Sequence, residues 1–205
     1  MTQSYATYAN VKTRLDLADD NDQTFITQLC TNANEYVEFY CRRAIGPTSG
    51  GTATFDADTD VYAGKLFVRN GVRSITSVTV APATGETAVT ATVADTIIMP
   101  RSQNRRPGWP GFWVIFKDVV SGSVSSWGTG QANIVMVYDS GWAAIPAEVT
   151  EVAEIIVARA WYGRQAGQAD IVGSDDTGAP LVSRFVSARD RETLKAFRPD
   201  LVAVG

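Results

Sequence analysis

The chain has 205 residues, 45% of them hydrophobic and 20% charged, a balance that suits one domain with an elaboration or two small domains. Its net charge of −4 argues against a protein that grips nucleic acid along its whole surface. It has no run of about 18 apolar residues, so no membrane span is expected, and residues 1–5 lack the basic start of a secretory signal.

Two helices are predicted near the N-terminus. The first is expected over about residues 7–17, and a break over 18–22, rich in Asp and Asn, offers an N-cap for the second. The second is expected to end near Arg43, because its apolar residues recur on a single helical face. Cys30 and Cys41 lie on this helix about 16 Å apart, at 1.5 Å per residue, so we interpret them as buried thiols that do not bond to each other.

A β-rich region is predicted over about residues 60–140, after a polar linker or long turn over 47–60. Asn70-Gly71 separates two runs of strand character and predicts a hairpin on a type I′ turn, because this pair tolerates positive φ at both corners. The strand-like runs are short and no helices alternate with them, which indicates an antiparallel sheet.

A strand-to-helix joint lies within residues 134–161. The β-run stops at Asp139-Ser140-Gly141, and Pro146 suits the first position of a helix expected to reach about Gln165. Apolar residues occupy more than one side of this helix, so we expect a neighbouring subunit to bury the second side. The side chains assigned to the bundle core and subunit contact are Val149, Val152, Ile156, Val157 and Trp161.

A last helix is predicted from a capping-box pattern at 187–190, with Leu194 and Phe197 facing inward. Charge is unevenly placed along the chain, because acidic residues dominate over 16–60 and basic residues over 181–205. An acidic end and a basic end suit head-to-tail assembly, whereas ordinary solvated faces explain the same pattern, and the sequence leaves both interpretations open.

The pattern Asp56-x-Asp58-x-Asp60 looks like the start of a calcium loop. An EF-hand needs Gly and Glu at later positions, which here hold Val61 and Phe67. We therefore expect a solvated acidic turn and no metal site.

The sequence gives no specific support for an enzyme. The absence of histidine excludes Ser-His-Asp and Cys-His catalysis and histidine-ligated zinc. Asp175 and Asp176 lie in a Gly-rich stretch with nothing apolar to raise a pKa, so a solvated loop is expected there. The sequence predicts no catalytic residue and no cofactor, and a protein that is not an enzyme.

A basic loop with aromatic residues precedes one of the predicted strands, and it contains Arg101, Arg105, Arg106 and Trp109. We interpret it as an exposed docking or channel loop, because arginine and tryptophan together can neutralise and stack on nucleic acid. In the alternative, the tryptophans pack on the sheet while the arginines reach water.

Several motifs, taken in order, resemble the head–tail connector (adaptor, or head-completion) proteins of tailed bacteriophages. They are Tyr40-Cys41-Arg42-Arg43, the strand of residues 74–78, the Asp139-Ser140-Gly141-Trp142 joint with Ile145-Pro146, residues 161–164, and the Leu-x-x-Phe-Arg-Pro pattern of residues 194–199. The resemblance spans most of the chain. The insertion is longer than expected for short members, so the loop over 100–111 has no counterpart.

The resemblance implies an α+β fold, mostly a helical bundle of about four helices with a central antiparallel β insertion. The expected parts are an N-terminal helix pair over 1–46, the insertion over 47–140, a long helix and flexible loop over 141–180 that belongs to the same bundle, and a C-terminal helix and portal-docking tail over 181–205.

The resemblance also implies a structural virion protein of the neck, assembled in the host cytoplasm, with no membrane partner. Copies of the chain would form a ring, expected to be dodecameric, below the portal protein. Genomic double-stranded DNA would pass through it non-specifically during ejection, and its far face would receive a stopper or tail-completion protein. The residues expected to dock on the portal are Arg189, Arg191, Lys195, Phe197 and Arg198.

Two alternatives belong to other classes. A tail-terminator or other ring-forming tail component would pair β-strands between subunits and would not need the helical arrangement. A carboxylate-dependent hydrolase would need acidic side chains that converge in an apolar pocket.

Overall fold

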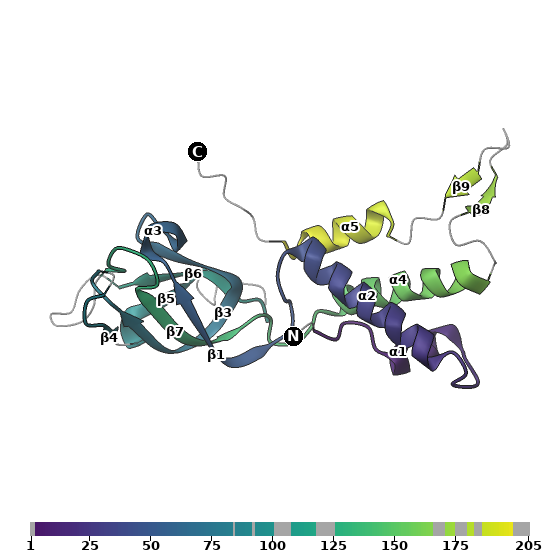
Figure 1. The fold of residues 1–205 in the computed structure, drawn as a ribbon, viewed down its shortest axis with the longest axis horizontal. Helices are drawn as coiled ribbons and strands as arrows, with labels where there is room; N and C mark the ends of the chain where they lie inside the picture. The colour runs from purple at the N-terminus through teal and green to yellow at the C-terminus, as the bar shows by residue number, and fades with distance from the viewer. Residues whose placement is uncertain are drawn as a thin grey trace. The chain divides into compact units, whose positions relative to one another are not determined.

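The structure is a computed structural model. It describes residues 3–83, 85–91, 93–100, 108–117, 126–165, 171–174, 180–182 and 186–198. The chain divides into two compact units: a helical unit made of Met1–Ala44 and Ile145–Gly205, and a β unit made of Ile45–Ala144 (Figure 1).

The expectation of a mostly helical bundle is wrong. Helices account for 38% of the structure and strands for 29%, and the strands of the β unit form a seven-stranded antiparallel sheet. The sheet has a hydrophobic core of its own, so the β-rich region is a compact unit rather than an elaboration of a bundle.

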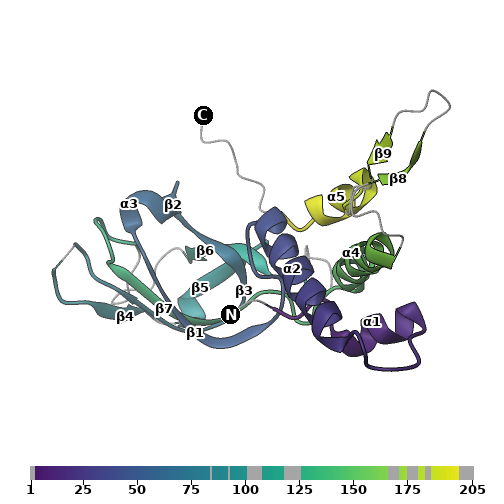
Figure 2. The same cartoon turned by 45° about the vertical axis from the view of Figure 1, so that its right-hand side comes forward.

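The helical unit holds four helices in its described part. They are α1 (Tyr8–Leu15), α2 (Gln23–Cys41), α4 (Ala147–Gln165) and α5 (Ala188–Lys195). The two long helices, α2 and α4, pack alongside each other, and α5 packs against both (Figures 1 and 2). A short antiparallel pair, β8 (Ile171–Ser174) and β9 (Pro180–Val182), lies in sequence between α4 and α5.

The helix ends follow local chemistry. The Thr7 side chain accepts a hydrogen bond from the Asn10 N–H, and Asp16 ends α1 in the left-handed region at φ 53°. The predicted capping box is confirmed at α5, where the Ser187 and Asp190 side chains each accept a hydrogen bond from the other residue's N–H. Helix α2 ends at Cys41, two residues before the predicted end, and its C-cap residue Arg42 is also left-handed.

Asn34 ties the N-terminal segment to the interior of the helical unit. Its side-chain oxygen accepts hydrogen bonds from the N–H groups of Tyr5, at 3.1 Å, and Ala6, at 2.8 Å, and its amide donates to the Ala6 carbonyl. A buried amide that forms three such bonds fixes this bend of the chain without any regular pairing.

The β unit contains seven strands and two short helices in its described part. They are β1 (Thr48–Phe55), α3 (Ala57–Asp60), β2 (Val61–Tyr62), β3 (Lys65–Val80), β4 (Val89–Ala91), the 3₁₀ turn η1 (Val93–Asp95), β5 (Thr96–Met99), β6 (Gly111–Phe116) and β7 (Ile134–Ser140). The strand order is β1-β7-β3-β6-β5, and β2 and β4 also pair with β3.

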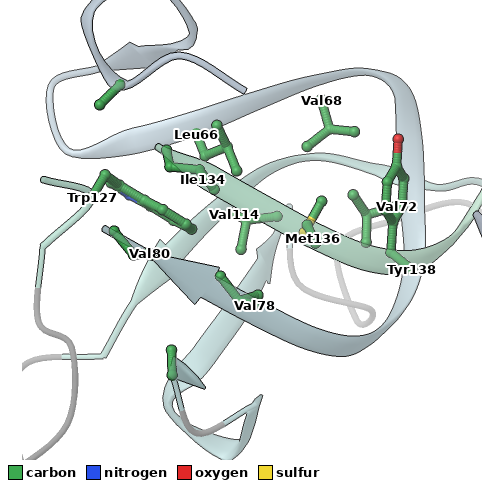
Figure 3. Close-up of a cluster of buried hydrophobic side chains, with 12 residues drawn as sticks. Leu66, Val68, Val72, Val78, Val80, Val114, Trp127, Ile134, Met136 and Tyr138 are labelled. Atoms are coloured by element: carbon green, nitrogen blue, oxygen red, sulfur yellow. The ribbon is translucent and has the colours of Figure 1, made fainter. Parts of the chain in front are cut away.

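The predicted hairpin at Asn70-Gly71 is wrong, because β3 continues through it as one 16-residue strand. Gly71 has a φ of 76°, and the pairing with β6 shifts register between Phe67 and Val72. Figure 3 shows β3 bending around the core, so that Leu66 and Val68 face inward from its first half and Val78 and Val80 from its second. The glycine therefore makes a bend within a strand.

The predicted linker over 47–60 is also wrong. Residues Thr48–Phe55 form an edge strand in register with β7, where Thr52 is paired with Val137 and Phe55 with Ile134. Asp139 ties this edge to the sheet, because its carboxylate accepts hydrogen bonds from the Gly50 N–H at 2.9 Å and the Ser74 hydroxyl at 2.8 Å. Those two bonds lower the pKa of Asp139.

Candidate interaction surfaces

The residues assigned to the bundle core all lie on α4 and are buried within a single chain. Val149 and Val157 are at most 1% exposed, and the others at most 7%; the full set is Val149, Val152, Ile156, Val157 and Trp161. Helices α1, α2 and α5 all pack against α4, so these five side chains are buried inside the helical unit. These side chains are core residues that position the surfaces around them.

Two ion pairs connect α4 to its neighbours. Arg14 of α1 donates to the buried Glu154 at 3.1 Å, and Arg159 pairs with the buried Asp190 of α5. Burial opposes ionisation of Asp190, but hydrogen bonds from Arg159 and from the Ser187 N–H and hydroxyl outweigh it and hold its pKa below the usual value. Asp190 thus has two roles, as helix cap and as the anchor of α5 on α4.

Helix α5 carries three exposed cations, which we call the α5 cations: Arg189, Arg191 and Lys195. Arg189 and Arg191 are two residues apart and so point to different sides of the helix, and Lys195 pairs with the exposed Glu192 at 3.5 Å. Phe197 points inward and is only 5% exposed, so it anchors the end of α5 instead of reaching the surface. The Arg198 guanidinium lies over the Tyr40 ring, 5.3 Å from its centroid. The structure therefore separates the predicted docking residues into surface cations and one core aromatic.

An apolar groove opens between α2 and α4. Its volume is about 750 Å³, within the range of ligand-binding pockets. Six of its lining residues are Phe25, Leu29, Tyr36, Ile156, Ala160 and Arg164. The Arg164 guanidinium lies 4.0 Å from the centroid of the Phe25 ring, and Phe25 also packs against Trp161. The helical periodicity placed these side chains on the correct faces but gave no sign that they leave a groove.

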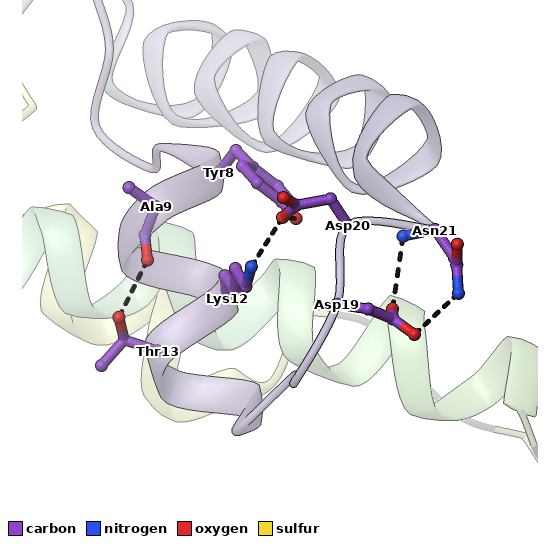
Figure 4. A network of polar contacts seen from close by, with 7 residues as sticks. All are labelled: Tyr8, Ala9, Lys12, Thr13, Asp19, Asp20 and Asn21. Atoms are coloured by element: carbon purple, nitrogen blue, oxygen red, sulfur yellow. Dashed lines mark hydrogen bonds and ion pairs between the residues drawn. The ribbon is translucent and has the colours of Figure 1, made fainter.

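The acidic break between α1 and α2 forms a small polar network (Figure 4). Asp20 accepts hydrogen bonds from Lys12, at 2.6 Å, and from the Tyr8 hydroxyl, and Asp19 accepts from Asn21. The hydrogen bond to Asp20 is the main reason that the pKa of Tyr8 rises to about 12. The same bonds from Lys12 and Tyr8 lower the pKa of Asp20. This network stabilises the turn that joins the two helices.

The two cysteines are free and buried, as predicted. Burial raises the pKa of Cys30 to about 11 and that of Cys41 to about 12. A thiol with a raised pKa is a poor nucleophile at neutral pH, so these residues behave as core side chains.

The carboxylates of the calcium-like turn bind backbone amides of a neighbouring loop. Asp56 accepts from the Ala132 N–H at 2.6 Å, and Asp58 accepts from the Gly130 N–H at 2.8 Å. Asp60 accepts from the Asp56 N–H at 2.9 Å. Across the described ranges, no three His, Cys, Asp or Glu side chains gather closely enough to hold a metal ion.

Of the predicted basic loop, Arg101, Arg105 and Arg106 lie outside the described residues. Trp109 is half-buried and packs edge-on against the buried Trp142, with ring centroids 5.5 Å apart. This is the packing that the second interpretation of the loop expects for its tryptophan.

Asp175 and Asp176 also lie outside the described part of the chain. Among the described helices, none has the length and apolar character that a membrane crossing requires.

A solved structure described as "Neck of empty GTA particle computed with C6 symmetry", where GTA denotes a gene transfer agent, contains a chain of similar fold. The two chains share a fold along their lengths. The match has a TM-score of 0.57 at 11% sequence identity, and it covers 100% of this chain and 95% of that chain. No family model matches the sequence, and no curated protein matches it.

Proposed function

We propose that the protein is a structural component of the neck of a tailed-phage-like particle, and within it a head–tail connector. One observation carries the proposal: the fold of the whole chain, both units included, matches that of a neck chain at a TM-score of 0.57. The match covers 100% of this chain and 95% of that chain, so it rests on both units and not on one of them. The ordered motifs in the sequence support the same assignment.

In this proposal copies of the chain close into a ring below the portal protein, within the virion. The neck in the solved structure has six-fold symmetry, with which a ring of twelve copies is compatible. A net charge of −4 suits a channel through which DNA moves without tight phosphate binding. The far face of the ring would receive the stopper or tail-completion protein.

The α5 cations and Arg198 are proposed to engage the portal protein. Exposed arginines and a lysine on one short helix suit an acidic partner surface and set association rate and orientation. Phe197 contributes indirectly, by anchoring the helix that carries these cations. We assign the protein no catalytic role, since the carboxylates with lowered pKa each have a structural hydrogen-bonding role.

Mass photometry of the purified protein, alone and with the portal protein of the same particle, tests the proposal. We expect a ring that contains the portal. Deleting α5 would also remove the buried Leu194 from the core, so substitution is the better probe. Arg189→Glu, Arg191→Glu and Lys195→Glu together should abolish portal binding while the fold persists. The matched control changes three exposed cations of the β unit: Lys65→Glu, Arg69→Glu and Lys117→Glu.

Each outcome has a distinct meaning. Rings that form without affinity for the portal, but that bind tail components, would favour the tail-terminator alternative. A strict monomer with and without portal would overturn the proposal. If portal binding survives the α5 substitutions, α5 is not part of the portal interface. The neck assignment would then depend on whether the protein forms a ring.

A further inference from the structure

We propose that copies of the chain join head to tail, with the outer side of α4 in one copy packed on the outward face of strands β2, β3, β6 and β5 in the next. The inference rests on the proposed neck function, because it assigns the contact that closes the ring. The two surfaces belong to different units, so each copy carries both halves of the contact. A contact between two different surfaces can repeat around a ring, and this one pairs no strands between copies.

The first surface is the outward face of the sheet. Side chains alternate between the two faces of a strand, and Leu66, Val68 and Val114 point into the core. The residues that alternate with them therefore point outward, and the register of the strands aligns those of neighbouring strands. The apolar residues of this outward face are Tyr62, Phe67, Ile97, Met99, Trp113 and Ile115.

An apolar outward face is unusual, because the outward face of an antiparallel sheet is commonly polar. The Phe67 and Trp113 rings pack together with centroids 5.0 Å apart, and Met99 is paired with Trp113 on its other side. Tyr62 is 50% exposed, and the other five apolar residues of the face are half-buried. A contiguous apolar patch that keeps part of its surface in water marks an interaction site.

The same face carries positive charge. Lys65 and Arg69 alternate with Phe67 along β3, and both are exposed. Strands β2, β3, β5 and β6 contain no acidic residue. The face is therefore cationic, although the chain as a whole has a net charge of −4.

The second surface is a stripe along α4, which we call the α4 outer stripe. Its residues recur at the i, i+4, i+7 and i+11 spacing of one helical side, from Glu151 through Ile155 and Ala158 to Tyr162. Ile155 and Ala158 are half-buried, and Tyr162 is 59% exposed. Glu148 and Glu151, both exposed, make the N-terminal end of the stripe acidic. The stripe is thus acidic at one end and apolar along the rest.

The arginines of α4 do not neutralise this stripe. Arg159 pairs with Asp190 of α5, and the Arg164 guanidinium lies over the Phe25 ring of α2. Both cations are thus directed at neighbouring helices of the same chain. The negative charge of the stripe is left for a partner of opposite charge, and the outward face of the sheet supplies one.

The two surfaces also match in size. Glu151 and Ala158 lie about 10 Å apart along the helix axis, at 1.5 Å per residue. Strands β3 and β5, with β6 between them, are two inter-strand spacings apart, which is also about 10 Å. When Glu151 lies over Lys65 and Arg69 of β3, Ala158 therefore lies over β5, where Met99 is an apolar neighbour.

Sedimentation velocity of charge-reversal variants, measured over a range of concentrations, tests the contact. The sheet variant carries Lys65→Glu and Arg69→Glu, and the helix variant carries Glu148→Lys and Glu151→Lys. Each variant alone should need about a tenfold higher concentration to form rings, because two like-charged pairs replace two surface ion pairs. All four residues are exposed, so the fold should persist, which circular dichroism checks.

Mixing the two variants is the decisive measurement. Each then presents to the other a surface of opposite charge, so an equimolar mixture should form rings that alternate the two and contain an even number of copies. A chain with all four substitutions should also regain rings. Rings that return in neither case would show that the two surfaces do not face each other. Rings that are unaffected in both single variants would likewise overturn the proposal.

Cysteine pairs distinguish contact between copies from contact within one copy. A chain with Ala158→Cys and Met99→Cys should form a ladder of covalent multimers on mild oxidation. Cys30 and Cys41 are buried and have raised pKa values, so they should contribute little. The control pair, Thr31→Cys with Met99→Cys, should form no ladder, because Thr31 is exposed on α2. Cross-links confined to single copies would overturn the contact between copies.

Portal binding separates this inference from the proposed function. The α5 cations belong to neither surface, so both charge-reversal variants should still bind the portal protein as single copies. Rings that ignore the reversals would overturn this contact without affecting the neck assignment. A wild-type chain that neither forms rings nor binds the portal would overturn both.

The outward face of the sheet has a second possible occupant, because aromatic and cationic side chains together also bind single-stranded nucleic acid. Titration of a labelled single-stranded DNA oligonucleotide into the wild type and the sheet variant tests this. We expect no difference between them beyond weak, salt-sensitive binding. If the sheet variant loses DNA affinity while its rings persist, the face binds nucleic acid and the contact between copies is overturned.

Discussion

Gly141, in the Asp139-Ser140-Gly141-Trp142 joint, is predicted to be a position that only glycine can occupy. Its φ is 74°, and a Cβ placed there would lie 2.1 Å from the Gly46 carbonyl oxygen, a backbone atom. Two hydrogen bonds hold this crossing: the Gly141 N–H donates to Asn70 and the Trp142 N–H donates to Ile45, each at 3.1 Å. Any side chain at residue 141 must push these backbone segments apart.

The expected cost of Gly141→Ala follows from these contacts. The left-handed conformation costs a non-glycine residue about 1 kcal/mol. Relief of the clash with Gly46 weakens two hydrogen bonds, which contribute about 1 kcal/mol each. We therefore expect the free energy of unfolding of the β unit to fall by about 3 kcal/mol.

The matched control is Gly50→Ala, because Gly50 has a similar φ of 62° but nothing lies within 4 Å of the place that a Cβ would take there. It should lose only about 1 kcal/mol. Urea unfolding followed by tryptophan fluorescence measures both, since Trp109, Trp113, Trp127 and Trp142 lie in the β unit and only Trp161 lies in the helical unit. Equal losses at Gly141 and Gly50 would refute the close approach and leave only the backbone conformation.

Three further predictions concern single groups. Asp190→Asn should lower the free energy of unfolding of the helical unit by about 2 kcal/mol at pH 7. Because the folded pKa of Asp190 is lowered, the stability advantage of the wild type should be full above the unfolded pKa of about 3.9 and should vanish as pH falls through the folded pKa. Urea titrations at pH 7 and pH 3 would check this, with Glu192→Gln, at an exposed residue, as a control that changes the stability little. Asn34→Ala should cost about 2 kcal/mol and speed hydrogen exchange at the Tyr5 and Ala6 amides, and unchanged exchange there would contradict the hydrogen bonds that Asn34 forms. Calcium should not raise the melting temperature, because Asp56 and Asp58 already bind backbone amides; a calcium-dependent rise that Asp58→Asn removes would show a metal site instead.

The helical elements could be predicted from the sequence to within a few residues. Helix α4 begins beside Pro146 and ends at Gln165, and the capping box at Ser187 and Asp190 forms as its pattern indicates. These features depend on residues three or four positions apart, and the sequence displays such neighbours directly. The burial of Leu194 and Phe197 followed from the same periodicity.

The strand predictions failed where pairing is not local. Residues Thr48–Phe55 contain few large apolar side chains and became a strand because β7, far later in the chain, offers a partner edge. Asn70-Gly71 carries the chemistry of a hairpin turn, yet different strands bind the two halves of β3: β6 and β2 pair with the first, and β7 and β4 with the second. Turn propensity was therefore overridden by long-range pairing.

The interaction surfaces show the same division. The sequence identified the cations of α5 and the apolar faces of α2 and α4, but it could not pair Arg14 with Glu154, 140 residues apart, or show that α2 and α4 leave a groove. By itself the sequence determined which stretches become helices, where they are capped and which of their faces are apolar, because short-range geometry sets these. Only the tertiary structure decided the size of the sheet, the bend at Gly71 and the groove, because each depends on how distant segments fit together in space.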